Sequence, residues 1–418
     1  MTAAFGGLEA AAWGILTFSI LVVLHELGHF LAARSFGVKI HEFMLGLPGP
    51  ALRFKTKNMT WGVTAIPLGG YVRIAGMEPG DEDELLADAL AAVRDGGIAG
   101  AESLARRIGV DEARADALLL TLIDWKAIEE REDGTAVLTV EGETHGLSGR
   151  ALLDRARTTT YRGQSTWRRI AILAAGVVTN LALAILVFTV VLSIWGYYEF
   201  TPQITAVAPD TPAAEAGIEP GETVVGFNGT EVERWEHFLQ MLATTDAGDT
   251  VTIDLERDGT IRTVELTLAE RDGHGYVGVS PTFVEVYPTV LESLGESFRM
   301  TGEVFRSIVR LFDPRTFTTT VRGVRSVIGV SVMAAEAAAA GPLSYAGLVA
   351  MLSLSLGVLN ILPLPPLDGG KIALELIERV LGRPLNRTLT LGLNTVGALL
   401  LFSLIGYIMF ADIARLIG

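Results

Sequence analysis

Four apolar segments constrain the fold of this chain more than any other feature of its sequence. They cover residues 11–34, 170–195, 343–363 and 389–410. Each is close to the roughly 20 mostly apolar residues that a helix needs to cross a bilayer. The mean hydropathy of +0.41 over 418 residues agrees with this pattern. We therefore expect a polytopic α-helical membrane protein with about four transmembrane helices and soluble parts between them.

The distribution of arginine and lysine predicts how these spans are oriented, because cytoplasmic loops of membrane proteins are enriched in both. Basic residues follow the first span, precede the second, and lie between the third and the fourth. We therefore expect residues 37–168 and 364–388 in the cytoplasm, and the N-terminus with residues 197–342 outside. Residues 1–14 hold no basic residue, so we expect the first span to be a permanent anchor and not a cleaved signal peptide.

A polar cluster interrupts the first span. The stretch LVVLHELGHF, residues 21–30, holds His25, Glu26 and His29, although each ionisable group costs roughly 2.5–3.5 kcal/mol at the centre of a bilayer. On a helix, residues four apart lie on one face, so both imidazoles can bind one metal ion. Glu26 can then act as general base toward a water. The chain has no cysteine, and histidine with carboxylate ligands predicts zinc held by three protein ligands.

The third ligand has several candidates. Asp368 is the strongest, because it lies in NILPLPPLDGGK, residues 360–371, where prolines break a helix. Irregular backbone at membrane depth is tolerated only where it is buried in protein or lines a cavity. The first and third spans are both expected to run inward, which brings Asp368 to the depth of the two histidines. A turn that merely ends the third span explains the prolines but not Asn360 in the apolar run. Glu42, in the hairpin region, is another possible ligand. The remaining histidines, His41, His145, His237 and His274, fall in segments expected to be soluble.

Two segments on the cytoplasmic side are expected to be soluble. Residues 37–77 alternate short β-prone runs with turns, which predicts a membrane-associated β-hairpin. Residues 78–154 form a cytoplasmic α+β insert with 19 acidic and 7 basic residues, a balance of −12 within a net charge of −15. Within it, residues 102–140 show the helix, turn, helix and hairpin pattern of a small winged-helix domain. DNA binding needs a basic surface, so we expect an acidic spacer or protein-contact domain and no nucleic-acid partner.

The segment expected outside the membrane resembles a PDZ domain of the protease-associated type. The resemblance covers residues 200–283 and rests on AAEAGI at 213–218 and FNG at 227–229. PDZ domains bind an extended peptide, commonly a C-terminus, along a sheet edge. A spacer that only screens the membrane site is the alternative. Residues 286–340 have helical periodicity and predict amphipathic helices at the membrane interface.

Taken in order, these motifs resemble the site-2 protease family, in the bacterial branch that carries out regulated intramembrane proteolysis. They are HELGH in the first span, AIPLGGYVRIAGM after it, AAGVVTN in the second span, the PDZ-like segment, and NILPLPPLDGG near the end. The resemblance implies that His25, His29 and Asp368 bind Zn²⁺ and that Glu26 is the general base.

The same resemblance implies substrate contacts and an activity. Asn360 would hold the substrate backbone or its oxyanion, and a hairpin at residues 67–71, with Gly69 and Gly70, would present an edge strand to the unwound substrate. The implied activity is hydrolysis of a peptide bond within the transmembrane segment of single-span proteins, such as a pre-trimmed anti-sigma factor. Substrate C-termini would bind the PDZ domain, and the implied location is the bacterial cytoplasmic membrane.

Three alternatives remain open. A non-catalytic PDZ-bearing receptor or scaffold would not need the intact Glu26. A metal transporter would spread ionisable residues along a path, whereas here they concentrate at one site. A protease that clears remnant signal peptides differs only in its substrate. The chain departs from the family pattern at Val177, where relatives often have proline, in the insert, and in its single PDZ-like segment. The sequence does not indicate an oligomeric state.

The chain therefore divides into eight expected regions. They are the first span with HELGH at 1–36, the β-hairpin region at 37–77, the acidic insert at 78–154, the basic flank and second span at 155–196, the PDZ domain at 197–284, the amphipathic helices at 285–342, the third span with its proline-rich end at 343–371, and the last loop and span at 372–418.

Overall fold

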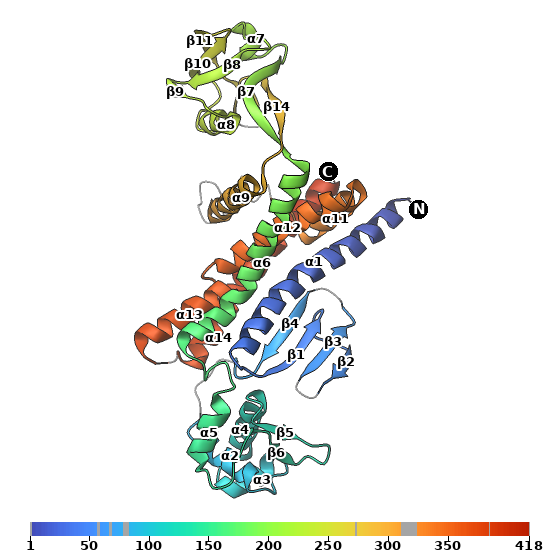
Figure 1. The fold of residues 1–418 in the computed structure, drawn as a ribbon, viewed down its shortest axis with the longest axis vertical. Helices are drawn as coiled ribbons and strands as arrows, with labels where there is room; N and C mark the ends of the chain where they lie inside the picture. Colours follow the sequence, from blue (N-terminus) through green and yellow to red (C-terminus); the bar gives the residue numbers. More distant parts are fainter. Residues whose placement is uncertain are drawn as a thin grey trace. The chain divides into compact units, whose positions relative to one another are not determined.

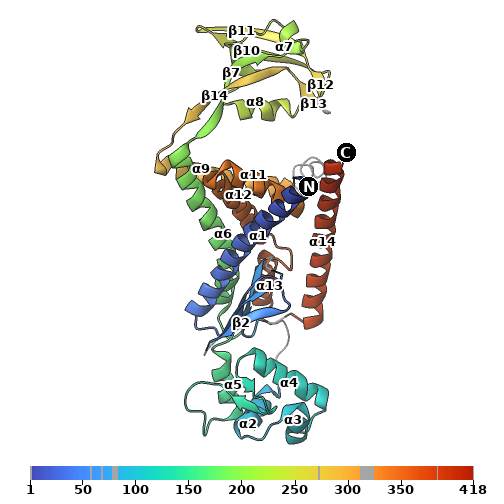
Figure 2. The same cartoon turned by 90° about the vertical axis from the view of Figure 1, so that its right-hand side faces the viewer.

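Long helices dominate the computed structural model of this chain (Figures 1 and 2). The structure describes residues 2–56, 59–66, 69–77, 83–271, 274–310, 324–383 and 385–417. The long apolar helices are α1 (Thr2–Ser35), α6 (Thr166–Trp195), α12 (Pro342–Ile361) and α14 (Arg387–Ile417). Within the described residues, these four contain the stretches long and apolar enough to cross a membrane, at 7–35, 166–195, 342–361 and 388–410. The four apolar segments predicted from the sequence coincide with these stretches to within a few residues.

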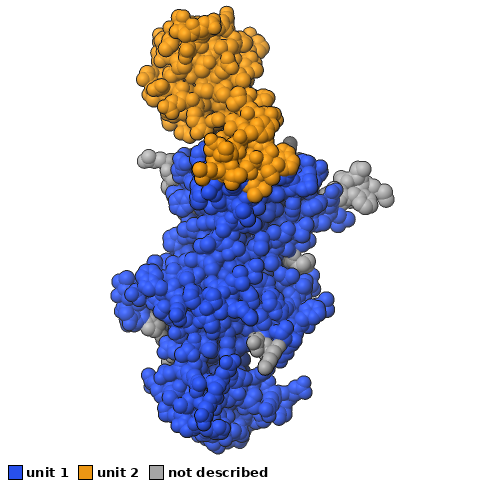
Figure 3. Space-filling model, in the orientation of Figure 1, with its two compact units in different colours: residues 1–189, 294–418 blue, residues 190–293 orange. Residues whose placement is uncertain are grey.

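The chain forms two compact units (Figure 3). One comprises residues 1–189 together with 294–418, and the other comprises residues 190–293. The first unit therefore holds most of the helices and every residue proposed for the metal site. The second unit matches the region that resembles a PDZ domain.

A four-stranded sheet follows α1 in the first unit. Its strands are β1 (Ile40–Leu45), β2 (Ala51–Lys55), β3 (Thr60–Thr64) and β4 (Gly70–Ile74), in the order β2-β3-β1-β4. β1 is antiparallel to β4 and parallel to β3. The expected hairpin is thus part of a larger mixed sheet, because β3 returns beside β1. β4 is an end strand and packs against α1, with a shared core that includes Phe30, Phe43, Ile74 and Ile172.

The acidic insert is a small domain with its own core. It contains α2 (Leu86–Arg94), α3 (Gly100–Ile108), α4 (Glu112–Asp124), β5 (Ile128–Glu130), β6 (Ala136–Leu138) and α5 (Gly149–Arg157). α3 ends at Gly109 in a left-handed conformation, and the Asp111 carboxylate caps α4 by accepting from the Arg114 backbone N–H. These are the elements that residues 102–140 predict. Residues 78–82 of the expected insert lie outside the described residues. The core includes Leu90, Leu104, Leu118, Leu122 and Leu152.

The second unit is built on a six-stranded sheet. Its strands follow the order β11-β10-β8-β7-β14, and β9 pairs with β8. The elements are β7 (Tyr197–Val207), α7 (Pro212–Glu215), β8 (Thr223–Phe227), β9 (Thr230–Glu231), α8 (Trp235–Leu242), β10 (Thr250–Arg257), β11 (Thr260–Thr267), β12 (Ala269–Arg271), β13 (His274–Tyr276) and β14 (Val279–Val286). β12 and β13 form a separate pair. The core gathers Ile204, Phe227, Phe238, Ile253 and Leu255. The expected β-rich fold of this region is confirmed.

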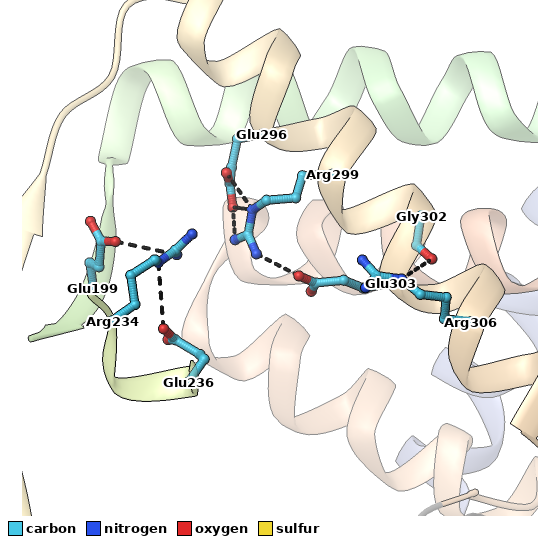
Figure 4. Close-up of polar contacts among 8 residues, drawn as sticks. All are labelled: Glu199, Arg234, Glu236, Glu296, Arg299, Gly302, Glu303 and Arg306. Atoms are coloured by element: carbon cyan, nitrogen blue, oxygen red, sulfur yellow. Dashed lines mark hydrogen bonds and ion pairs between the residues drawn. The ribbon is translucent and has the colours of Figure 1, made fainter. Parts of the chain in front are cut away.

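Two helices, α9 (Val290–Arg310) and α11 (Val327–Ala340), precede the third span. α9 exposes an apolar stripe at Leu291, Phe298 and Phe305, and Arg299 pairs with two glutamates, Glu296 and Glu303, on another face (Figure 4). It therefore has the amphipathic character that the sequence predicts. α11 packs against α1, so it belongs to the helical bundle. Residues 311–323 lie outside the described residues.

Candidate metal centre

Three buried side chains from two distant helices converge on one point. His25 Nε2 lies 3.0 Å from Asp368 Oδ2, His29 Nε2 lies 3.2 Å from the same oxygen, and the two imidazole nitrogens are 3.2 Å apart. All three residues are buried. Zinc ligands at about 2.0–2.2 Å in a tetrahedral arrangement stand about 3.3–3.6 Å from one another. A small outward shift of these atoms therefore admits the ion.

The hydrogen-bonding state of these atoms also suits a cation. His29 Nδ1 lies 2.7 Å from the Ile172 carbonyl oxygen, which can only accept, so Nδ1 carries the proton and a neutral ring keeps its lone pair on Nε2. Within the described part of the chain, Asp368 Oδ2 is buried without a hydrogen-bond partner. His29 Nε2 and Asp368 Oδ2, 3.2 Å apart, thus present lone pairs to one another, and these repel unless a positive charge lies between them. The donor set and its geometry fit zinc.

The two helices present the ligands for local reasons. His25 and His29 are one turn apart on α1 and share a face. α12 ends at Ile361 and the next helix, α13 (Asp368–Leu381), begins at Asp368, because the intervening prolines cannot continue a helix. A Cβ on Gly369 would lie 2.2 Å from the Ile361 carbonyl oxygen, so only glycine allows α13 to start this close to the end of α12. Asp368 is thereby placed in the first turn of a helix, which favours its charge.

The floor of the site is one face of α6, which the sequence motifs did not predict. Ile172, Gly176 and Asn180 are spaced by four residues and lie against the two histidines. A Cβ on Gly176 would lie 2.4 Å from His29 Nε2 and 2.7 Å from His25 Cε1. Gly176 and Asn180 in AAGVVTN are four residues apart, as are His25 and His29 in HELGH. This shared spacing is the sequence signal that could have indicated the pairing of α1 with α6.

Glu26 lies beside the ligands and is held by the sheet. Its Oε2 accepts a hydrogen bond from the backbone N–H of Val72 at 3.1 Å. Val72 belongs to β4, the end strand next to α1. The unpaired edge of β4 therefore faces the candidate site, and one of its N–H groups is bound to Glu26.

The other predicted substrate residues lie at two places around the same centre. Asn360 is buried in the last turn of α12, and Asp368 follows across the proline-rich loop. Gly69 has φ +83°, and a Cβ added to it would lie 3.7 Å from the Val22 side chain of α1. Gly70 opens β4. Pro67 and Leu68 lie outside the described residues.

Neither Glu42, the other possible ligand, nor His41 is brought to the centre. The Glu42 carboxylate accepts from the Tyr71 hydroxyl at 3.3 Å, and His41 Nε2 contacts the Asp124 carbonyl oxygen at 2.8 Å. Among the described residues, His25, His29 and Asp368 are the one group of three metal-binding side chains that meet. The His274 side chain lies outside the described part of the chain.

Comparison with known proteins decides the family. The family described as "Peptidase family M50" matches residues 13–404, which is nearly the whole chain. The chain belongs to this family. The M50 chain is 28% identical to a Brucella suis protein with a provisional zinc metalloprotease name, over 96% of this chain and 93% of that protein. It is 26% identical to "Zinc metalloprotease RasP" of Bacillus licheniformis, over 96% of this chain and 98% of that protein. A solved PDZ domain of an SdrC-like protein from Listeria monocytogenes covers 21% of this chain and 90% of its own, at 19% identity and a TM-score of 0.18.

Membership in M50 confirms the predicted enzyme class. The protein is a site-2-type protease, and zinc is its metal. The receptor and transporter alternatives are therefore set aside in favour of the protease. The four apolar helices agree with a membrane location for this peptidase.

Proposed function

We propose that this M50 protease cleaves a peptide bond within the transmembrane segment of single-span membrane proteins, with His25, His29 and Asp368 as the zinc ligands. The observation that carries the proposal is the meeting of these three buried side chains, at 3.0–3.2 Å, beside Glu26. The chemistry that zinc supplies in such a site is polarisation of a carbonyl and a water with a pKa lowered to about 7.

Glu26 is the proposed general base. It directly follows His25, the first proposed ligand, in α1, and its Oε2 accepts from the Val72 backbone N–H. Its carboxylate takes a proton from the attacking water and passes it to the leaving amide nitrogen. The N–H of Val72 holds Oε2 in place while the other oxygen can face the water.

Strand β4 is the proposed docking edge for the substrate. A peptide bond in a regular helix is protected by its own hydrogen bonds, so the substrate must unwind before it can be cut. An unwound segment can add to the free edge of β4, which begins at Gly70, directly after Gly69, and contacts Glu26 through Val72. Asn360, buried near the ligand loop, is the proposed contact for the substrate backbone or the oxyanion.

The second unit is the proposed PDZ domain, and we assign it a peptide C-terminus as ligand. Support comes from the motifs at 213–218 and 227–229 and from β14, an end strand that can accept an added strand. The charge distribution supports a proposed orientation in which the N-terminus and this domain lie outside the bacterial cytoplasmic membrane and the acidic insert lies inside. The proposed substrate is a single-span protein already trimmed outside the membrane, such as an anti-sigma factor.

Cleavage of a single-span model substrate by the purified protein in detergent tests the proposal. Wild type, Glu26→Gln and Asp368→Ala are compared, and zinc is measured in the same preparations. We expect Glu26→Gln to keep zinc and lose about 10²–10⁴-fold or more in rate, because the base is removed and the ligands remain. Asp368→Ala is expected to lose both zinc and cleavage.

Two results would contradict the assignment. Normal cleavage by Glu26→Gln would remove the base from the mechanism. Full zinc content in Asp368→Ala would remove the third ligand. Cleavage of remnant signal peptides in preference to trimmed single-span proteins would keep the chemistry and change the substrate class.

A further inference from the structure

A buried amide on α6 faces the first zinc ligand. Asn180 is fully buried, and its Nδ2 lies 3.4 Å from His25 Nδ1, the ring nitrogen that does not point at Asp368. Over the described residues, Asn180 Oδ1 has no hydrogen-bond partner. A buried acceptor without a donor costs about 1–3 kcal/mol, so an unpaired amide oxygen in this position calls for a function.

The two orientations of this amide select different forms of His25. When Nδ2 donates to Nδ1, a neutral ring carries its proton on Nε2, the atom that meets His29 and Asp368. That form cannot bind a metal through Nε2. A half-turn of the amide exchanges its oxygen and nitrogen without changing its shape. Oδ1 then accepts from Nδ1–H, and Nε2 has a free lone pair.

The second histidine shows the same arrangement with a backbone acceptor. The Ile172 carbonyl oxygen accepts from His29 Nδ1 at 2.7 Å. Ile172 and Asn180 are eight residues apart on α6, and the two histidines are four apart on α1, so each imidazole meets its own acceptor on one face. Gly176 lies between these acceptors and leaves room for both rings.

The backbone of Asn180 is fixed independently of its side chain. The Ser353 hydroxyl, on α12, donates to the Asn180 carbonyl oxygen at 2.9 Å. The amide is therefore held at the metal centre by packing of α6 against α12, and a half-turn of the amide does not disturb this contact.

We propose that Asn180 is the positioning residue of His25: in the zinc-bound protein its Oδ1 accepts from His25 Nδ1–H and keeps Nε2 available to the ion. The proposal rests on the ligand set proposed above. Partners of this kind fix the form and orientation of a ligating histidine, and their removal typically weakens metal affinity 10–100-fold.

Equilibrium zinc affinity of the full-length protein in detergent, measured by competition with a chelator, tests this role apart from cleavage. Asn180→Leu keeps the size and removes the acceptor, and we expect zinc to bind 10–100-fold more weakly. Asn180→Asp restores an acceptor at the same place, and its affinity is expected within a few-fold of wild type. Asn180→Ala provides a smaller variant if the leucine protein does not fold, with the same expected loss.

Two further variants separate the possible failures. Ser353→Ala removes the contact to the Asn180 backbone and leaves the amide, so wild-type affinity is expected; a loss equal to that of Asn180→Leu would assign the effect to packing and overturn the proposal. Unchanged affinity in Asn180→Leu, or no recovery in Asn180→Asp, would overturn it as well. His25→Ala is measured in parallel: if it binds zinc as wild type does, the ligand set itself is wrong.

Discussion

Gly176 shows how a residue with no chemistry of its own can decide whether a metal site exists. Its α-carbon faces both imidazoles, and a single added methyl group would meet His29 Nε2 at 2.4 Å. Both rings are buried, so neither can move away into solvent. Alanine would stabilise the α6 helix more than glycine does, so helix formation does not explain Gly176. The two imidazoles explain it, because they occupy the space that a side chain would need.

Gly176→Ala is expected to weaken zinc binding by at least tenfold and to reduce cleavage in proportion, because the new Cβ displaces His29 from its position. Gly347→Ala is the matched control. Gly347 also lies in an apolar spanning helix, α12, and a Cβ there meets nothing within 4 Å. Chelator competition on both proteins measures the effect. Equal zinc affinity in the two variants would contradict the proposed contact of Gly176 with the ligands.

At the scale of elements, α13 depends on a buried ion pair for its position. The Arg169 guanidinium of α6 lies 2.9 Å from a Glu375 carboxylate oxygen, and the Tyr161 hydroxyl donates to the other at 3.0 Å. Burial raises the pKa of Glu375, so its charge is maintained by the arginine beside it. Glu375 lies two turns after Asp368 in the same helix. The pair thus ties α13, which carries the proposed third ligand, to α6, which forms the floor of the candidate site.

Glu375→Ala is expected to destabilise the protein by about 1–3 kcal/mol, because the buried Arg169 guanidinium loses its carboxylate at 2.9 Å and keeps only the more distant Glu378 carboxylate at 3.9 Å. Thermal unfolding of the full chain in detergent, followed together with zinc release, measures this effect. Glu102→Ala is the control, since Glu102 forms an exposed pair with Arg106 on α3 that is worth only about 0.3–0.5 kcal/mol. A change no larger than that of the control would show that α13 is positioned by other contacts.

The spans and the helix break follow directly from short stretches of sequence. Apolar runs predict α1, α6, α12 and α14, and the prolines at 363–366 predict the end of α12 before Asp368. The sheet is different. A run of β-prone residues and turns predicts a hairpin between neighbouring strands. It does not indicate that β3 pairs in parallel with β1, because β2 lies between them in the chain.

At the scale of the whole first unit, the acidic insert is attached to the strands that reach the metal centre. Asp124 of α4 accepts from the Gly76 backbone N–H, just beyond β4, at 3.0 Å. The Lys126 ammonium donates to the Ile40 carbonyl oxygen of β1 at 2.8 Å, and the Lys39 ammonium donates to the Lys126 carbonyl oxygen at 3.0 Å. Burial lowers the pKa of both lysines. The insert is therefore anchored to β1 and β4 through specific polar contacts.

Asp124→Ala is expected to loosen this attachment by about 0.5–1.5 kcal/mol, because the Gly76 N–H loses the carboxylate oxygen at 3.0 Å and keeps only the backbone carbonyl oxygen of residue 124 at 3.3 Å. Hydrogen exchange of the full chain in detergent is expected to become faster at Gly76 and in β1, while zinc content stays at the wild-type level. Asp116→Ala is the matched control, since Asp116 is exposed on the same helix. Identical exchange in both variants would contradict a role for Asp124 in anchoring the insert.

The sequence by itself determined the features that depend on spacing along the chain. Apolar length predicts the spans, and an i, i+4 pair of histidines with an adjacent glutamate predicts a metal-dependent hydrolytic site on one helix face. The motif order also indicated the family, which the match over residues 13–404 confirms.

Only the tertiary structure shows which distant groups lie beside the two histidines. The sequence made Asp368 the strongest candidate for a third ligand, and α13 places it 3.0 Å from His25; the α6 acceptors for the two imidazoles had no prior assignment. These contacts form because α1 and α6, which are far apart in the chain, pack closely enough for Gly176 and Asn180 to touch the two imidazoles. Local periodicity carries no information on such packing, because it depends on the shapes of two surfaces that the chain brings together only when folded.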